Sequence, residues 1–313
     1  MAQTMNISIV GAGAMGSFFG GLLAEAGHAV TLIDVNEAHL SAIQTQGLLL
    51  DTDAGQRRVQ GLRACRPHEA AELPDLLMVF TKTLHTTQAL LGVRHLIGDR
   101  THVLSLQNGL GNVEKITEYV PIERVLVGVT TWPADLVGPG EVHSHGQGGV
   151  RLMSADGRDH VLIATVVTAF SDAGLLARKD EAVWCAIWEK VAFNAALNCI
   201  CGVSGSTVGQ VGDLAESRVL AHAVVSEVLA VAQAHGIAVK PDAVHATVDH
   251  ALDHHKNHKP SMLQDLLAGR ATEIDAICGS VLRQGRSLGV ATPLTEAFHA
   301  LVRLKEASSR PAV

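Results

Sequence analysis

A glycine-rich segment lies near the start of the chain. Gly11, Gly13 and Gly16 have the spacing GxGxxG, directly after the β-branched run Asn6–Val10 and at the start of a helical pattern. In this context the first glycine permits a tight turn, the second lets the backbone approach a pyrophosphate, and the third lets helix and strand pack closely. The helix N-terminus also favours phosphate charge. We therefore expect a dinucleotide here rather than an incidental Gly-rich turn, held by Gly11, Ala12, Gly13, Ala14, Met15 and Gly16.

An acidic residue follows this loop at a spacing that bears on the choice of dinucleotide. Asp34 ends the run VTLID, 18 residues beyond Gly16, where a carboxylate accepts hydrogen bonds from the adenosine ribose hydroxyls. A 2′-phosphate would meet like charge there, and no Arg or Lys lies between Asp34 and Ala54. The cofactor is therefore expected to be NAD or NADP, with NAD favoured. The alternative is an ordinary solvated Asp at a strand end.

The segment WEKVAFNAALN carries polar groups at helical spacing. Lys190, Asn194 and Asn198 stand at i, i+4 and i+8, on one stripe of a helix, and can all face one cleft. A Lys and two Asn within an otherwise apolar helix are costly unless they are paired or used. The alternative is a solvated face, but the neighbouring apolar residues define no separate polar side.

A second polar cluster lies in KPSMLQDLLAGRATEID. Ser261 with Gln264 fits a capping box at a helix start after Pro260, which is a purely structural explanation. Glu273 has an equally plain alternative, a surface carboxylate on a helix. These residues alone do not decide between structure and function.

The elements that position these residues divide the chain into two halves. Asn6–Val10, Ala29–Val35, Leu76–Thr81 and Val103–Gln107 are typical of buried parallel strands that alternate with helices. This βαβαβ order predicts an α/β fold, a Rossmann-type doubly wound parallel sheet that binds ligands at the carboxyl ends of its strands. The segment from Val125 to Ser154 predicts a small antiparallel extension of that sheet.

Helices are expected to dominate the rest of the chain, first over Asp159 to Asp172 and then from Ala182 to about Lys305. We therefore predict a dinucleotide-binding Rossmann domain over residues 1–178 and an all-helical substrate and dimerisation domain over residues 179–307. A mobile tail is expected over residues 308–313.

Composition narrows the classes of partner. The net charge is −7 and the basic residues are scattered, so no basic face is available for nucleic acid. No apolar stretch is long enough to span a bilayer, and the N-terminus lacks the pattern of a signal peptide. The five cysteines show no zinc or CxxC spacing. We expect a cytoplasmic protein that forms a homodimer and binds a small molecule, with neither nucleic acid nor membrane as partner.

Taken together, the motifs resemble those of the ketopantoate reductases, also called 2-dehydropantoate 2-reductases. The resemblance rests on GAGAMG at the glycine loop, TK at Lys82, SLQNGLGN around Asn108, WEKVAFNAALN and KPSMLQDLLAGRATEID, and it extends over nearly the whole chain. It implies that Lys190 is the general acid and base, and that Glu273 supports it and binds substrate. The substrate's carboxylate and hydroxyl would be held by Asn194, Asn198 and Ser261, and Lys82 and Asn108 would lie near the nicotinamide.

The residue types suit the implied reduction of 2-dehydropantoate to pantoate in pantothenate biosynthesis. Hydride addition to the carbonyl carbon turns the oxygen into an alkoxide, so a protonated donor is needed there. Burial would lower the pKa of Lys190 towards neutrality, and a nearby Glu273 carboxylate would raise it.

Two positions depart from the family pattern. Asp34 stands where NADP(H)-dependent members tend to carry a basic residue, and His258, expected to touch substrate, stands where the pantoate-forming enzymes often have Asn. They leave open an NAD-dependent dehydrogenase of another 2-hydroxy acid on the same scaffold.

Two more distant alternatives remain. One is the 3-hydroxyisobutyrate and 6-phosphogluconate dehydrogenase group, against which SMLQD and TEID argue. The other is a dinucleotide-binding protein without catalysis, which fold alone does not exclude.

The chain has seventeen histidines, and His250, His254 and His258 share i, i+4 spacing, close to His245 and His255. Helical His pairs can bind zinc, but the sequence identifies neither a fixed further ligand nor the groups that would orient it. We expect no metal site here, and interpret the segment as a polar helix.

Overall fold

The computed structural model describes residues 4–309, which form two compact units. The first unit contains the chain up to Gln107 together with Asn112–Val183, and the second contains Asn108–Gly111 together with the chain from Trp184 onward. The short segment Asn108–Gly111 thus packs with the second unit although the first unit surrounds it in sequence. Each unit has its own core and is described separately.

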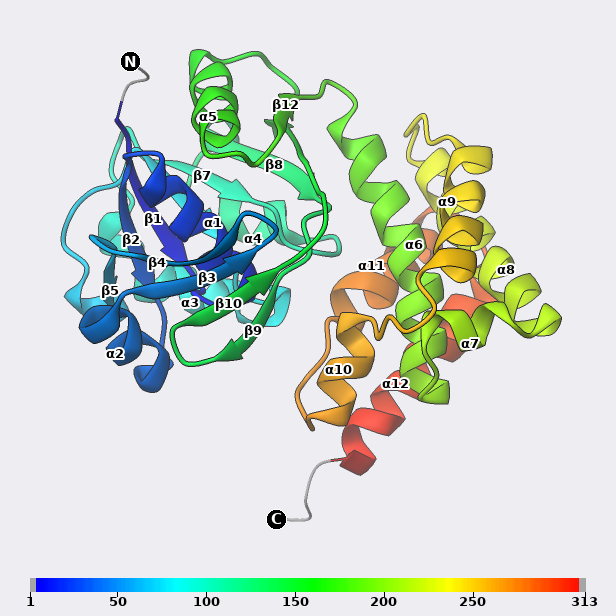
Figure 1. Cartoon of the computed structure of the whole chain (residues 1–313). Helices are drawn as coiled ribbons and strands as arrows, with labels where there is room; N and C mark the ends of the chain where they lie inside the picture. Colours follow the sequence, from blue (N-terminus) through cyan, green and yellow to red (C-terminus); the bar gives the residue numbers. More distant parts are fainter. Residues whose placement is uncertain (1–3, 310–313) are drawn as a thin grey trace. The chain divides into compact units, whose positions relative to one another are not determined.

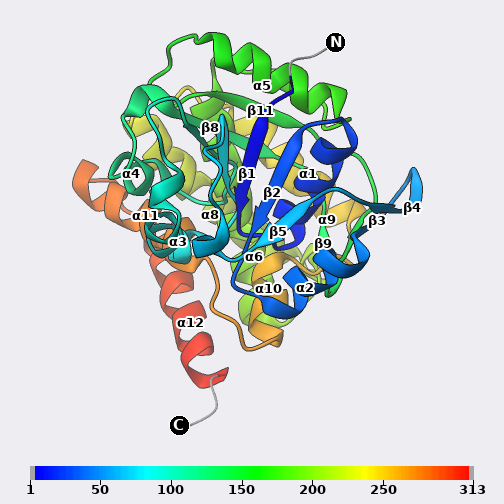
Figure 2. The same cartoon turned by 90° about the vertical axis from the view of Figure 1, so that its left-hand side faces the viewer.

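The first unit is built on an eight-stranded sheet within the described residues, with strand order β12-β11-β8-β7-β6-β1-β2-β5 (Figures 1 and 2). Its strands are β1 (Asn6–Val10), β2 (Ala29–Ile33), β5 (Arg63–Cys65), β6 (Leu76–Val79), β7 (His102–Ser105), β8 (Val125–Thr130), β11 (Val150–Ser154) and β12 (Ala177–Lys179). All neighbouring strands along the series β5-β2-β1-β6-β7-β8 are parallel. This is the doubly wound arrangement, in which the strand order reverses between β1 and β6. The α/β Rossmann-type fold class predicted from the sequence is confirmed.

Buried apolar runs explain why these segments form the central strands. Every residue of β6 and β8 is buried, as are four of the five residues of β1. A parallel sheet covered on both faces requires such continuous apolar strands. Ile9, Leu32 and Phe19 have no exposed surface and lie at the centre of this core.

A second, four-stranded sheet has the order β4-β3-β10-β9. Its strands are β3 (Leu48–Thr52), β4 (Gly55–Val59), β9 (Asp135–Gly138) and β10 (Glu141–Ser144). This sheet corrects the predicted antiparallel extension over Val125 to Ser154. Only β11 extends the main sheet in antiparallel fashion, whereas β8 is parallel to β7 and the β9–β10 hairpin pairs with β3. The sequence predicted strands in this segment, but not which strand they would pair with.

Helices cover the first unit's sheets and connect their strands. They are α1 (Ala14–Glu25), α2 (Glu37–Gln46), α3 (Thr86–Gly92), α4 (Asn112–Thr117) and α5 (Val161–Asp172), with short 3₁₀ turns η1 (Pro67–Glu69), η2 (Thr83–His85), η3 (Arg94–Leu96) and η4 (Ile122–Arg124). The helix predicted to begin at Asp159 begins at Val161 instead, because His160 has an extended backbone and is the N-cap.

The described residues of the second unit are helical apart from their connecting loops (Figure 1). The helices are α6 (Val183–Ser204), α7 (Val208–Gly212), α8 (Ala215–Ala234), α9 (Pro241–His254), α10 (Ser261–Leu267), α11 (Ile274–Leu288) and α12 (Pro293–Ser309). The core contains the middle of α6, where residues 194–202 are all buried, and the apolar faces of α8 and α11. Of the predicted tail 308–313, the first two residues continue α12, and residues 310–313 lie outside the described residues. Among the described helices, none is both long enough and apolar enough to cross a membrane.

Candidate functional site

The glycine loop of the first unit joins β1 to α1, and each glycine has a different reason to be there. Gly11 has a φ of +93°, and a Cβ at this position would lie 2.5 Å from the backbone nitrogen of Thr81. A Cβ on Gly16 would lie 2.0 Å from the Gly11 carbonyl oxygen. At Gly13, by contrast, φ is −67° and a Cβ would meet nothing within 4 Å. Folding thus requires glycine at 11 and 16, while the open space at Gly13 suits the close approach of a ligand.

Asp34, at the end of β2, is tied to this loop. Its carboxylate accepts hydrogen bonds from the backbone N–H groups of Ala12 (2.7 Å), Val35 (2.7 Å) and Asn36 (2.9 Å). Its carboxylate has a fixed orientation at the C-terminal end of β2, beside the loop.

A buried histidine that the sequence analysis did not identify also supports the loop. The Gly140 N–H donates to His39 Nδ1 (2.9 Å), so His39 Nε2 carries the proton and donates to Ser17 Oγ (2.9 Å). Ser17 Oγ in turn donates to the Ala12 carbonyl (2.8 Å). Burial lowers the pKa of His39, which favours this neutral form. No local motif marks His39, because its partner Gly140 lies 101 residues away.

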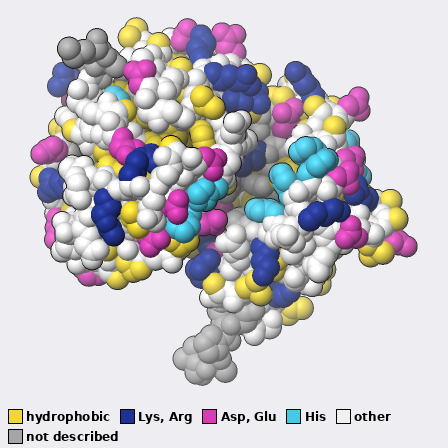
Figure 3. Space-filling view, viewed as in Figure 1, with side chains coloured by type: hydrophobic (Ala, Val, Ile, Leu, Met, Phe, Trp, Pro, Cys, Tyr) yellow, Lys and Arg dark blue, Asp and Glu magenta, His cyan; other side chains and the backbone are white. Residues whose placement is uncertain are grey.

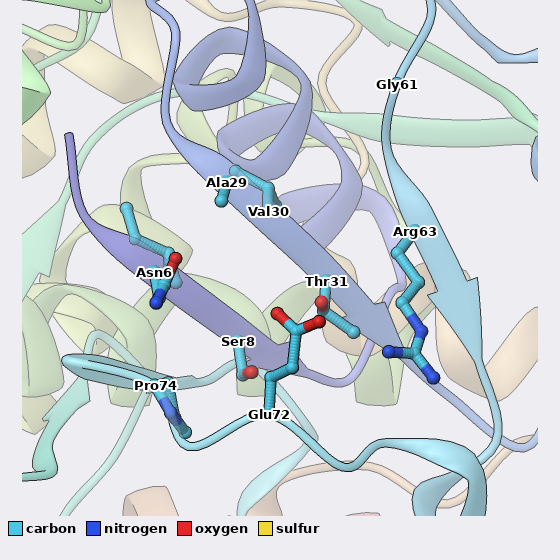
Figure 4. Close-up of a pocket in the computed structure, with 10 residues that line it drawn as sticks. Asn6, Ser8, Ala29, Val30, Thr31, Gly61, Arg63, Glu72 and Pro74 are labelled. Atoms are coloured by element: carbon cyan, nitrogen blue, oxygen red, sulfur yellow. The ribbon is translucent and has the colours of Figure 1, made fainter.

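Lys82 lies immediately before η2, in the connection that follows β6, and is partly exposed. It is therefore at the C-terminal edge of the parallel sheet, as is the glycine loop. A separate pocket lies near the opposite, N-terminal ends of β1 and β2, and Figure 4 shows Arg63 and Glu72 beside Thr31 there. Because phosphates bind at the C-terminal edge in this fold, that pocket is not the dinucleotide site.

In the second unit, helix α6 carries the predicted polar stripe. Asn194 and Asn198 are only 8% and 6% exposed, and Lys190 is partly exposed one turn earlier. Burying amide groups among Ala, Val and Leu is unfavourable unless they have partners. The solvated face allowed by the sequence is therefore wrong for the two asparagines.

Lys190 is the ionisable residue of this stripe, and its pKa is shifted. Desolvation lowers its pKa to about 8, and the carboxylate of Glu273 opposes part of that fall. These are the two opposing influences expected from the sequence. A lysine that titrates near pH 8 can both give and recover a proton close to neutral pH.

Glu273 is held in place at the start of α11. Asn108 Nδ2 donates to Glu273 Oε2 (3.2 Å), and the neighbouring Leu110 N–H donates to the Ala276 carbonyl (2.8 Å). The segment Asn108–Gly111 is thereby joined to the N-terminal turn of α11. Asn108, predicted from the resemblance to lie at the nicotinamide, is a direct partner of the carboxylate that acts on Lys190.

Ser261 does not form the predicted capping box. It is the first residue of α10, Pro260 is the N-cap, and no side chain caps the helix; Gln264 donates to the Lys259 carbonyl instead. The proline, which fixes the backbone entering the helix, places Ser261 one position too late to cap it. Next to it, Met262 Sδ lies 4.0 Å from Cys199 Sγ, so α10 packs on α6 one residue after Asn198. His258 lies in the exposed loop before α10, and its carbonyl accepts from the Val208 N–H.

Comparison with known proteins agrees with this geometry. The family described as "Ketopantoate reductase PanE/ApbA" matches residues 7–157, and "Ketopantoate reductase PanE/ApbA C terminal" matches residues 182–306. A 2-dehydropantoate 2-reductase of Streptococcus pyogenes serotype M3 is 34% identical over 304 residues, which cover 97% of this chain and 98% of that protein.

Solved structures are similar over the same length. A D-mandelate dehydrogenase with NADH and anilino(oxo)acetate is 33% identical with a TM-score of 0.92, over 97% of this chain and 99% of that one. A PanE/ApbA family ketopantoate reductase from Ralstonia eutropha JMP134 is 30% identical with a TM-score of 0.90, over the same shares. These matches confirm the resemblance inferred from the motifs.

Proposed function

Since this chain belongs to the ketopantoate reductase family of nicotinamide-dependent oxidoreductases, we propose that it reduces the 2-keto group of 2-dehydropantoate to give pantoate. The observation that carries this proposal is Lys190, whose pKa falls to about 8 on a stripe with two buried amides and beside Glu273. That combination provides a proton donor, neutral donors for an anion, and a carboxylate that keeps the lysine partly charged.

The chemistry assigned to the chain's residues is proton transfer and orientation. When bound, a reduced nicotinamide would supply the hydride for the carbonyl carbon. Lys190 donates a proton to the oxygen as it becomes an alkoxide, and the neutral lysine then regains a proton from solvent. Asn194, Asn198 and Ser261 hold the substrate's carboxylate and hydroxyl. Because these donors are neutral, they bind the anion without lowering the pKa of Lys190 further.

On the cofactor side, the glycine loop fits a pyrophosphate and Asp34 selects NAD(H). The Asp34 carboxylate already accepts three backbone N–H groups, and one lone-pair direction of its two oxygens is left for a ribose hydroxyl. A 2′-phosphate at the same place would face this negative charge. Lys82 and Asn108 are proposed to act at the nicotinamide end.

A second candidate is an NAD-dependent dehydrogenase of another 2-hydroxy acid. The similarity to a D-mandelate dehydrogenase with NADH supports it, and so do Asp34 and the exposed His258. An imidazole in the loop before α10 offers an aromatic face to a substrate that is bulkier or flatter than 2-dehydropantoate. Both candidates use the same Lys190 chemistry and differ in the acid that is bound.

Initial rates distinguish the two. NADH and NADPH oxidation are measured separately with 2-dehydropantoate and with a panel of 2-keto acids that includes phenylglyoxylate. We expect the highest kcat/KM with NADH and 2-dehydropantoate. Turnover of another 2-keto acid with negligible reduction of 2-dehydropantoate would establish the second candidate. Nucleotide binding without turnover of any 2-keto acid would contradict both and favour a non-catalytic binder.

We also propose that the protein is a homodimer in the cytoplasm. Leu267 on α10 and Leu304 on α12 are each 66% exposed, so a partner subunit that covered them would bury apolar surface. The five described cysteines are free thiols, which suits a reducing compartment. Light scattering that gives the mass of a single chain would contradict the dimer.

A further inference from the structure

The second sheet of the first unit places five ionisable side chains on one face. Asp51 on β3 is directly paired with His143 on β10, and alternation along β10 puts Glu141 on the same face as His143. Asp53 and His145 each follow one residue after the end of β3 and β10, and His145 contacts both Asp51 and Asp53. The residues that precede Asp51 and flank His143 point the other way, since Leu50, Val142 and Ser144 are buried. Figure 3 shows histidine and acidic side chains gathered together on the surface of the first unit.

Three of these side chains converge on one point. One ligand atom each from Asp51, His143 and His145 lies within 4.8 Å of the others. His143 Nε2 is 3.7 Å from Asp51 Oδ2, and His145 Nε2 is 3.5 Å from Asp51 Oδ1. Around a tetrahedral Zn²⁺ with bonds of about 2.0–2.1 Å, neighbouring ligand atoms are about 3.4 Å apart. The side chains therefore need only small movements to bind one ion.

The remaining two carboxylates fit the same purpose. His145 Nδ1 lies 3.1 Å from Asp53 Oδ1, while Asp53 Oδ2 accepts from the Gly146 N–H (2.8 Å). A histidine that donates through Nδ1 to a carboxylate presents the lone pair of Nε2, which is the usual support for a metal-binding imidazole. Glu141 Oε1 is 3.0 Å from His143 Nε2 and can supply a fourth ligand.

From this arrangement we propose a Zn²⁺ site formed by Asp51, His143 and His145, with Glu141 as fourth ligand and Asp53 orienting His145. Two imidazoles favour zinc over Ca²⁺ or Mg²⁺, which take oxygen ligands. The ion would join β3 to β10, strands from segments about 90 residues apart, and so brace the sheet that also carries Gly140, the partner of His39. The site shares no residue with the proposed catalytic stripe.

Direct binding of the metal tests this proposal. ZnCl₂ is titrated into the metal-free full-length protein by calorimetry without nucleotide, and the bound metal is counted after dialysis. The variant His143→Ala/His145→Ala is compared with a matched control, His250→Ala/His254→Ala, which removes the stacked imidazole pair of α9. We expect one tight equivalent in the native chain, at least 100-fold weaker binding in the first variant, and unchanged affinity in the control.

A milder variant guards against misfolding. Asp53→Asn leaves all four proposed ligands in place, and loss of the supporting carboxylate should weaken binding 10- to 100-fold. Co²⁺ bound to the native chain should give the strong visible bands of tetrahedral coordination, and Zn²⁺ should abolish them. The proposal is overturned if the native chain binds no tight equivalent, or if His143→Ala/His145→Ala binds the ion as tightly as the native chain does.

Discussion

Replacing Lys190 with Met should abolish turnover and stabilise the fold at the same time. The pKa of Lys190 falls from 10.5 to about 8 in the folded chain. At about 1.4 kcal/mol per pH unit, keeping the lysine charged at pH 7 therefore costs the folded state about 3 kcal/mol. Met fills a similar volume and carries no charge, so the variant should recover a large part of this free energy of unfolding.

The pH dependence gives the sign of the effect. Between pH 8 and 10.5 the unfolded chain still binds the Lys190 proton and the folded chain has released it, so the stability of the native protein rises with pH in this window. Below pH 8 both states are protonated and the full cost is present. The advantage of Lys190→Met should therefore be constant below about pH 8 and disappear towards pH 10.5.

Urea unfolding of the native protein and of Lys190→Met, at pH 7 and at pH 10, gives the free energy of unfolding of each. The exposed Lys240, replaced in the same way, is the control, and its replacement should leave the free energy of unfolding nearly unchanged at pH 7. With NADH and keto acid, Lys190→Met should lose turnover by orders of magnitude while nucleotide affinity is kept. If the variant is no more stable than the native protein at pH 7, Lys190 does not carry a desolvated charge and its assignment as proton donor loses its basis.

Three further outcomes are expected. The variant Gly13→Ala should be as stable as the native protein, because a Cβ there meets nothing within 4 Å, but it should bind NADH more weakly in a fluorescence titration. The variant Gly11→Ala should also have a lower Tm, because Gly11 has a φ of +93°. Asp34→Arg should shift the ratio of kcat/KM for NADPH over NADH upward, and an unchanged ratio would remove Asp34 from the cofactor site. Glu273→Gln removes the charge that raises the pKa of Lys190, so keto-acid reduction should decline from a lower pH than in the native enzyme. For a fall of about one pH unit, the ratio of rates at pH 8 and pH 6 should drop about fivefold, and an unmoved pH profile would show that Glu273 acts only through contacts.

The features that the sequence predicted are encoded by residues close together in the chain. The glycine loop is recognisable because strand, turn and helix are contiguous, and the stripe of Lys190, Asn194 and Asn198 follows from helical periodicity alone. The family resemblance implied that Glu273 acts on Lys190, and the opposing influences of burial and Glu273 on its pKa are present in the structure. The capping box predicted at Ser261 does not form because α10 begins one residue earlier than it requires. Pro260 is the N-cap, and Ser261 is already the first residue of the helix.

What escaped prediction depends on which distant strand becomes a neighbour. The partner of β10 is β3, and nothing in either segment specifies a pairing in which His143 faces Asp51. In the sequence, the two aspartates and the two histidines of that cluster are unremarkable i, i+2 pairs on polar strand faces. The i, i+4 spacing of the histidines in α9 is recognisable from the sequence alone. It is the imidazole of His143 on β10, however, that has a carboxylate, Asp51, directly opposite on the paired strand. Spacing within one element shows which side chains share a face; the carboxylate opposite His143 comes from β3, and only the pairing of β3 with β10 places it there.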